Sequence, residues 1–185
     1  MVLTKTPICN YGEKANSFKL KGIDGKLHEL EDHIGKNGIL IMFICNHCPY
    51  VKAVVKDIVN DSKMLASEGV KVIAINSNDT NDYPEDSFEN MILFAKKNNF
   101  EFPYLIDETQ EVAKKYGAVC TPDFFGYNKN LELQYRGRIR ELKELKPTRS
   151  GDSDLYKAMK QIAETDNGPK DQIPSMGCNI KWINN

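Results

Sequence analysis

The sequence has no long apolar run and no excess of charge of either sign. Its apolar stretches end far short of the roughly 20 residues that a membrane-spanning helix needs. Lys and Arg number 25 and Asp and Glu 26, so the formal net charge is -1, which argues against nucleic acid or a membrane surface as partner. The first ten residues lack the charged, apolar and small-residue order of a signal peptide. We expect a cytoplasmic protein.

Cysteine is scarce, and its number is odd. The five cysteines lie at positions 9, 45, 48, 120 and 178 of a 185-residue chain. This usage favours a few chemically active thiols in a reducing compartment over a secreted disulfide framework. A hydrophobic content of 41% over this length suffices for a core without disulfide support. We expect no cofactor and no resident metal.

Cys45 and Cys48 form a Cys-x-x-Cys pair between an apolar strand and a helix. Residues 39–44 are all apolar, as in a central strand that is covered on both faces. After the pair, apolar residues recur at helical spacing at Val51, Val54, Val55, Ile58 and Val59. Unpaired amides and the dipole at a helix N-terminus favour a thiolate. We therefore expect Cys45 to be a nucleophile and Cys48 its partner in catalysis.

Such a pair could serve redox chemistry, bind zinc, or consist of two inert core thiols. Only His47 lies near, and no second Cys-x-x-Cys follows. A tetrahedral zinc site would have to recruit a distant residue such as Cys120 or Cys178. The position at the strand–helix junction favours redox chemistry, and a metal-binding or redox-sensing module remains the alternative outside enzymes.

The remaining pattern alternates strands and helices and predicts an α/β protein with a mixed sheet. A hairpin is expected at 18–30 around Asp24-Gly25 and a second one over 123–127 and 131–138. Further strands are expected at 70–76 and 102–107, helices at 87–98, 111–116 and 155–164, and a charged loop at 141–154.

Thr121-Pro122 follows the third helix and precedes the second hairpin, an order that resembles the thioredoxin superfamily. The resemblance implies a thioredoxin-like fold over residues 1–185, with a mixed central sheet flanked by helices, an N-terminal β-hairpin and a C-terminal extension at 141–185. It also implies a cis proline facing the dithiol. A substrate segment could then pair with Thr121 as an added strand, so Thr121 and Pro122 are the expected substrate-binding residues.

Several phrases narrow the resemblance to the peroxiredoxin-like branch, related to AhpC/TSA and TlpA-like proteins: residues 43–52, 78–79, 83–87, 120–125 and 174–178. A peroxiredoxin site reads Pro-x-x-x-Thr/Ser-x-x-Cys. Counting back from Cys48 places Cys45 and Ile41 at the hydroxyl and proline positions, and counting back from Cys45 gives Met42 and Gly38. Neither register fits. We therefore favour a thiol-disulfide oxidoreductase over an antioxidant thiol peroxidase, which remains the alternative enzyme.

His47 is expected to raise the reduction potential of the Cys45–Cys48 pair, because an imidazolium stabilises a thiolate and hence the reduced form. The expected potential lies above the value of about -270 mV typical of thioredoxin. The alternative is that His47 merely faces solvent. Many thioredoxins bury an acid where this sequence has Ile39, so water, His47 or an acid from elsewhere must accept the proton of the second thiol.

The expected mechanism has Cys45 attack a substrate disulfide and Cys48 resolve the mixed disulfide. The substrate is a disulfide-containing protein or a small thiol compound, and an external thiol reductant restores the dithiol. Cys178 is a possible resolving cysteine for a sulfenic acid or mixed disulfide on Cys45. Alternatively, Ile180 and Trp182 dock the tail and bury Cys178. Cys120 either lies near the dithiol or points into the core.

Overall fold

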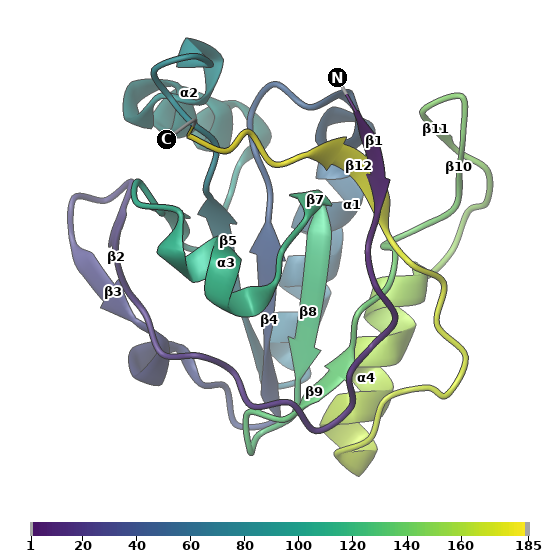
Figure 1. Cartoon of the computed structure of the whole chain (residues 1–185). Coiled ribbons are helices and arrows are strands. Elements are labelled where there is room, and N and C mark those ends of the chain that lie inside the picture. The colour runs from purple at the N-terminus through teal and green to yellow at the C-terminus, as the bar shows by residue number, and fades with distance from the viewer. Residues whose placement is uncertain (1, 184–185) are drawn as a thin grey trace.

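The computed structural model describes residues 2–183, and its main feature is a seven-stranded mixed sheet (Figure 1). Strands β4, β5 and β6 run parallel, while β2, β3, β8 and β9 pair antiparallel. The mixed sheet matches the predicted α/β pattern. The spatial order is β3-β2-β6-β5-β4-β8-β9, with bounds β2 Lys19–Gly22, β3 Leu27–Glu29, β4 Gly38–Phe43, β5 Val70–Asn76, β6 Tyr104–Ile106, β8 Asp123–Tyr127 and β9 Leu133–Tyr135.

Helices cover both faces of this sheet. Alternate residues of β4 enter two different cores: Leu40 and Met42 pack with α1, α2 and α4, whereas Ile39 and Ile41 pack with α3. All six residues of β4 are buried, as expected of a central strand. The helices are α1 Pro49–Ser67, α2 Phe88–Asn98, α3 Glu111–Tyr116 and α4 Asp154–Thr165, with short 3₁₀ turns η1 Leu30–His33 and η2 Pro84–Asp86.

Local signals account for several of these boundaries. The side chain of Ser87 accepts a hydrogen bond from the Asn90 amide and caps α2. Gly117 ends α3 with a φ of 61°, in the left-handed region that glycine adopts without a Cβ penalty. The predicted hairpin around Asp24-Gly25 is confirmed as β2 and β3.

A second sheet pairs the first strand of the chain with the last one, and the sequence did not predict it. Its order is β1-β12-β7, from β1 (Leu3–Lys5), β12 (Met176–Asn179) and β7 (Cys120–Thr121). Figure 1 shows purple β1 and yellow β12 side by side above the end of β8. The expectation of a plain loop at 141–154 is also wrong, because β10 (Leu142–Lys143) and β11 (Lys146–Pro147) form a small hairpin there.

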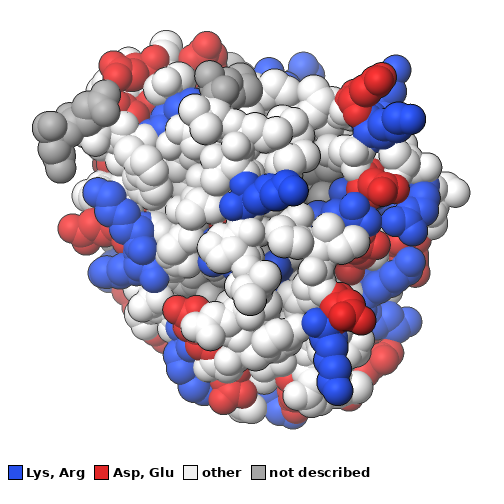
Figure 2. Space-filling view, turned by 45° about the vertical axis from the view of Figure 1, so that its right-hand side comes forward, with Lys and Arg blue, Asp and Glu red and all other residues white. Residues whose placement is uncertain are grey.

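The surface carries both signs of charge. Figure 2 shows acidic and basic side chains interspersed around one face, whose middle is mostly uncharged apart from a basic side chain that lies across it. This distribution agrees with the near-zero net charge of the sequence. Within residues 2–183, no helix is long and apolar enough to cross a membrane.

Candidate redox site

The Cys-x-x-Cys pair lies at the predicted junction of strand and helix. Cys45 follows β4 by two positions, and Cys48 is the N-cap of α1. Both side chains are buried, with exposures of 1% and 0%. The Thr121-Pro122 peptide bond is cis, as the resemblance implied. The fold thus brings the dithiol and this loop together.

Three sulfurs and one threonine form the centre of the site. The Cys45 Sγ lies 3.3 Å from Thr121 Oγ1, and the Cys48 Sγ lies 3.1 Å from the Thr121 carbonyl oxygen. On its other side, the Cys48 Sγ lies 2.9 Å from the Sγ of Cys178. All five cysteines are reduced thiols in this structure. Cys48 therefore contacts Thr121 and Cys178 at once.

Of the two thiols, Cys48 has the lower pKa. A hydrogen bond from the Cys45 thiol, followed by bonds from the Cys178 thiol and the Val51 amide, lowers the pKa of Cys48 despite its burial. Burial raises the pKa of Cys45, and its hydrogen bond to Cys48 and the nearby Asp86 charge raise it further. Because α1 begins at Pro49 with Cys48 as its N-cap, its first turn lies next to Cys48, whereas the sequence pattern led us to expect its effect on Cys45.

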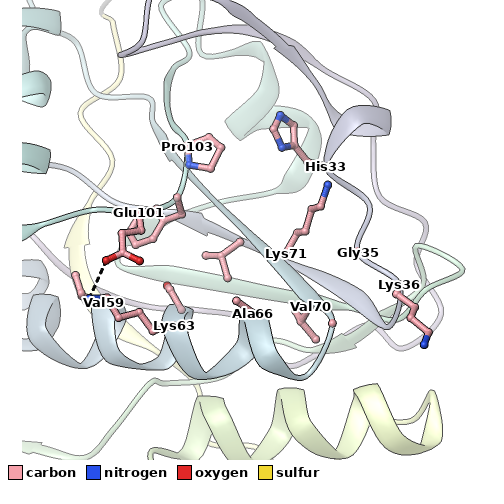
Figure 3. A pocket seen from close by; sticks show the side chains of 14 residues that line it. His33, Gly35, Lys36, Val59, Lys63, Ala66, Val70, Lys71, Glu101 and Pro103 are labelled. Atoms are coloured by element: carbon pink, nitrogen blue, oxygen red, sulfur yellow. Dashed lines mark ion pairs between the residues drawn. The ribbon is translucent and has the colours of Figure 1, made fainter.

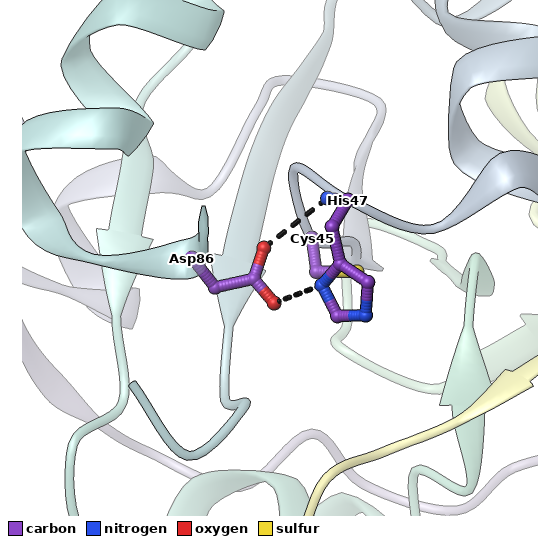
Figure 4. Close-up of side chains that lie close together, drawn as sticks. All are labelled: Cys45, His47 and Asp86. Carbon is purple, nitrogen blue, oxygen red and sulfur yellow. Dashed lines mark hydrogen bonds and ion pairs between the residues drawn. The ribbon is translucent and has the colours of Figure 1, made fainter. Parts of the chain in front are cut away.

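Asp86 holds the loop between the two cysteines, and the sequence reasoning missed it. Its fully buried carboxylate accepts hydrogen bonds from the Asn46 amide at 2.7 Å and the His47 amide at 3.3 Å. It also accepts bonds from Asn78 Nδ2 at 2.7 Å and lies 2.7 Å from His47 Nδ1 (Figure 4). The His47 ring stacks on Tyr83, with centroids 5.5 Å apart.

The contact between His47 and Asp86 shifts the pKa values of both side chains. The hydrogen bond to Asp86 raises the pKa of His47. Burial raises the pKa of Asp86, but the bonds from His47 and Asn78 outweigh it and leave that pKa below its usual value. The alternative that His47 merely faces solvent is therefore wrong. Asp86 is also a buried acid from elsewhere in the chain, one of the proton acceptors that the sequence left open because Ile39 is not an acid.

Cys45, His47 and Asp86 each offer a metal-ligating atom, and these atoms lie within 4.8 Å of one another. A structural zinc site normally has four ligands, whereas this group has three. Moreover, the carboxylate of Asp86 is already engaged with its four protein donors. The donor set therefore fits an oriented histidine better than a bound metal.

The C-terminal strand occupies the edge at which a substrate strand was expected. In β12, Cys178 lies opposite Thr121 of β7. Gly177 packs so closely that an added Cβ would lie 2.0 Å from the Thr121 carbonyl oxygen. The Ser175 hydroxyl donates to the Pro122 carbonyl at 2.8 Å. A substrate can pair with Thr121 only where β12 has moved away.

The tail is docked by hydrogen bonds as well as by an apolar side chain. Ile180 is buried, whereas Trp182 is 37% exposed, so only the first of the two predicted anchors is in the core. The Lys181 amide donates to Asn78 Oδ1 at 2.9 Å, and Gln110 Nε2 donates to the Lys181 carbonyl at 2.8 Å. Within β12 itself, only Gly177 beside Cys178 could have indicated from the sequence that this strand packs against β7.

The other two cysteines lie apart from this chemistry. Cys120 is fully buried, and its thiol donates to the Pro122 carbonyl at 3.6 Å. Burial raises its pKa far above the usual value, which agrees with the interpretation of Cys120 as a core residue. Burial also raises the pKa of Cys9, to about 11.

Two hollows flank α1. One, of about 500 Å³, lies toward the C-terminal end of α1 and contains no predicted site residue (Figure 3). The other, of about 260 Å³, adjoins the site through Tyr50, Pro122 and Met176. Its two arginines are already paired, Arg138 with Asp154 at 2.7 Å and Arg140 with Asp57 at 3.0 Å.

Comparisons with known proteins identify the family and the fold of the chain. The AhpC/TSA family model matches residues 11–142. An uncharacterized conserved protein from Geobacillus kaustophilus is 40% identical, with a TM-score of 0.94, over 99% of this chain and 97% of that one. Thiol-disulfide oxidoreductase ResA from Bacillus thuringiensis is 28% identical over 130 residues, 69% of each chain. The thioredoxin domain of a Bacteroides vulgatus oxidoreductase, BVU-2223, shares the fold, with a TM-score of 0.64, 14% identity and coverage of 83% and 97%.

Proposed function

The chain belongs to the AhpC/TSA family and has a thioredoxin-like fold, and within that family we propose that it is a thiol-disulfide oxidoreductase. The observation that carries the proposal is the pair of buried sulfurs, those of Cys45 and Cys48, which both contact Thr121 beside the cis Pro122. The lowered pKa of Cys48 supports it. Two adjacent sulfurs, one of them a thiolate, are what disulfide exchange requires. The similarity to the protein named thiol-disulfide oxidoreductase ResA supports the same reaction.

In the proposed mechanism the roles expected of the two cysteines are exchanged. The Cys48 thiolate attacks a substrate disulfide, so that a mixed disulfide forms on Cys48 and one substrate sulfur leaves as a thiolate. Cys45 then loses its proton and attacks the Cys48 sulfur. This second exchange closes the Cys45–Cys48 disulfide and releases the other substrate sulfur. An external thiol reductant restores the dithiol.

His47 moves the protons in this scheme. One of its ring nitrogens lies within 4.8 Å of the Cys45 sulfur, and the Asp86 contact favours the imidazolium. The imidazolium gives a proton to the first substrate thiolate that leaves. Neutral His47 then takes the proton of Cys45 and passes it to the second substrate thiolate. Two protons, one from His47 and one from Cys45, thus end on the two product thiols. Asp86 acts as a positioning residue for His47.

The substrate is a disulfide-containing protein or a small disulfide that enters beside Pro122. The adjoining hollow, lined by Tyr50, Pro122 and Met176, lies next to β12. Because Cys48 is fully buried, attack needs β12 to move locally. Thr121 and Pro122 would then present a strand edge to an extended substrate. Action in the cytoplasm, without cofactor or nucleic-acid partner, remains part of the proposal.

Equilibration in graded glutathione buffers, followed by alkylation and peptide mapping by mass spectrometry, tests this function. We expect a Cys45–Cys48 disulfide to form at one defined potential and to be absent in Cys45→Ser and Cys48→Ser. Cys9→Ser, which removes a thiol outside the site, is the matched control. A pair that stays reduced while the protein consumes peroxide rapidly would favour the thiol peroxidase instead. Metal retained through purification would favour the metal-binding module.

A further inference from the structure

We propose that Cys178 is a third redox-active cysteine, and that the Cys45–Cys48 disulfide passes within the protein to Cys48–Cys178. This inference rests on the proposed function, which supplies the first disulfide. It starts from the contact of 2.9 Å between the sulfurs of Cys48 and Cys178. The Cys48 sulfur is also hydrogen-bonded to Cys45, so it can form a disulfide with either neighbour.

The strand pairing makes this contact a property of the fold. β12 is the middle strand of its sheet and is paired on one edge with β1 and on the other with β7. This register places Cys178 opposite Thr121, whose carbonyl oxygen lies 3.1 Å from the Cys48 sulfur. Cys178 is 2% exposed. It therefore reaches Cys48 from a docked strand.

Gly177 allows the close approach. A Cβ at this position would lie 2.0 Å from the Thr121 carbonyl oxygen and 2.6 Å from its carbon, both of which are backbone atoms. Backbone cannot yield as a flexible side chain can, so any larger residue must push β12 away from β7. The small residue beside Cys178 thus holds the third sulfur within reach of Cys48.

The transfer is a balanced thiol-disulfide exchange. Cys178 gives up its proton, and its thiolate attacks the Cys48 sulfur of the Cys45–Cys48 disulfide. The Cys48–Cys178 bond forms, the Cys45–Cys48 bond breaks, and Cys45 leaves as a thiolate that receives the proton. The protein as a whole stays oxidised by two electrons, so the step needs no oxidant beyond the substrate disulfide already reduced.

The transfer has two consequences for the site. It returns Cys45 to the thiol state beside His47 and Asp86, and it ties β12 covalently to the start of α1. The tied strand covers the Thr121 edge, so a second extended substrate cannot pair there. The external reductant must then reduce a disulfide that involves the C-terminal strand.

The test uses Cys45→Ser in the full chain, because only Cys48 and Cys178 then remain at the centre. The variant is oxidised with oxidised glutathione, alkylated and mapped by mass spectrometry. We expect an intramolecular Cys48–Cys178 disulfide, and in the wild type a mixture of Cys45–Cys48 and Cys48–Cys178. Glutathione that stays attached to Cys48 in Cys45→Ser, with no Cys48–Cys178 bond, would overturn the inference.

Cys178→Ser separates this inference from the proposed function. If Cys178→Ser forms Cys45–Cys48 while Cys45→Ser forms no internal disulfide, the oxidoreductase proposal stands and the transfer fails. If Cys45–Cys48 forms neither in Cys178→Ser nor in the wild type, the proposed function itself fails.

Gly177→Ala tests whether the docked strand is responsible. Combined with Cys45→Ser, it should slow formation of the Cys48–Cys178 bond at least tenfold. Leu3→Ala is the matched control, since Leu3 lies opposite Cys178 on the neighbouring strand β1 and is 52% exposed. Circular dichroism checks that both variants are folded. An unchanged rate in folded Gly177→Ala would contradict the role assigned to β12.

Discussion

At the scale of single residues, Cys48 differs from Cys45 through its donors. The Cys45 thiol, the Cys178 thiol and the Val51 amide all stabilise a negative charge on Cys48, whereas Cys45 faces the carboxylate of Asp86. We therefore predict one thiolate that persists well below the usual cysteine pKa near 9. Ultraviolet absorbance of the thiolate during a pH titration should detect it.

Two substitutions show which cysteine carries the thiolate. Cys48→Ser should abolish this low-pH absorbance. Cys45→Ser should retain it, because the serine hydroxyl still donates a hydrogen bond to the Cys48 sulfur. The opposite pattern, with the thiolate lost only in Cys45→Ser, would restore Cys45 as the attacking residue.

His47 should make the couple more oxidising. Its imidazolium, favoured by the contact with Asp86, attracts the Cys48 thiolate and so stabilises the reduced protein. His47→Ala in a Cys178→Ser background should lower the potential on the order of 30 mV, which corresponds to about 1.4 kcal/mol for two electrons. Tyr83→Phe keeps the ring that stacks on His47 and is the control. A potential that does not move in His47→Ala would rule out this tuning.

At the scale of elements, a buried carboxyl joins α1 to α4. Asp61 is 2% exposed, and Ser153, the N-cap of α4, donates to it at 2.5 Å. Burial raises the pKa of Asp61 to about 7. In the unfolded chain, the pKa of Asp61 is near the ordinary value of 3.8. As the pH rises, Asp61 therefore loses its proton in the unfolded chain before it does so in the folded protein. The contribution of Asp61 to the free energy of unfolding should therefore fall between about pH 4 and pH 7 and level off above.

Asp61→Asn should remove this dependence, because the amide stays neutral and can still accept the Ser153 hydroxyl. Relative to the wild type, the free energy of unfolding of Asp61→Asn should rise with pH across that window, in total on the order of 4 kcal/mol. Urea unfolding at several pH values measures it. Asp152→Asn, which changes an exposed neighbour, is the control. Parallel pH profiles for Asp61→Asn and the wild type would refute the prediction.

The sequence predicted the elements whose signals are local. The apolar run at 39–44 and the helical spacing that begins at Val51 lie within single elements, and they became β4 and α1. In contrast, β12 is a strand because β1 and β7 pair with it, and both lie far away in the sequence. Asp86 escaped prediction for the same reason, since only the folded chain brings η2 against the loop at Asn46.

At the scale of the whole molecule, the first strand, β1, pairs with the last strand, β12, which lies beside the dithiol. The sequence pattern predicted the junction that carries Cys45 and Cys48, and the resemblance implied the cis proline. The position of Cys178 depends on a sheet assembled from both termini and the Pro122 loop, which periodicity cannot reveal. The site is therefore enclosed by strands β1, β12 and β7, which the sequence pattern did not predict.

This arrangement predicts unequal stability across the molecule. The seven-stranded sheet lies between two cores, whereas β1, at the edge of the small sheet, has an exposed residue at each end. A segment with fewer buried apolar contacts opens at lower free energy. In the reduced protein, amides of β12 should exchange with solvent at least tenfold faster than those of β4, a difference of about 1.4 kcal/mol.

Oxidation should reverse part of this difference. A Cys48–Cys178 disulfide ties β12 to α1, so exchange in β12 should slow in the oxidised wild type and stay fast in oxidised Cys178→Ser. Hydrogen exchange read by mass spectrometry on the two proteins, reduced and oxidised, provides the four measurements. Equal slowing in Cys178→Ser would mean that the Cys45–Cys48 disulfide alone stiffens the site. Exchange in reduced β12 as slow as in β4 would mean that the small sheet opens only with the whole fold, and substrate would then have to reach Cys48 through the hollow beside Pro122 with β12 in place.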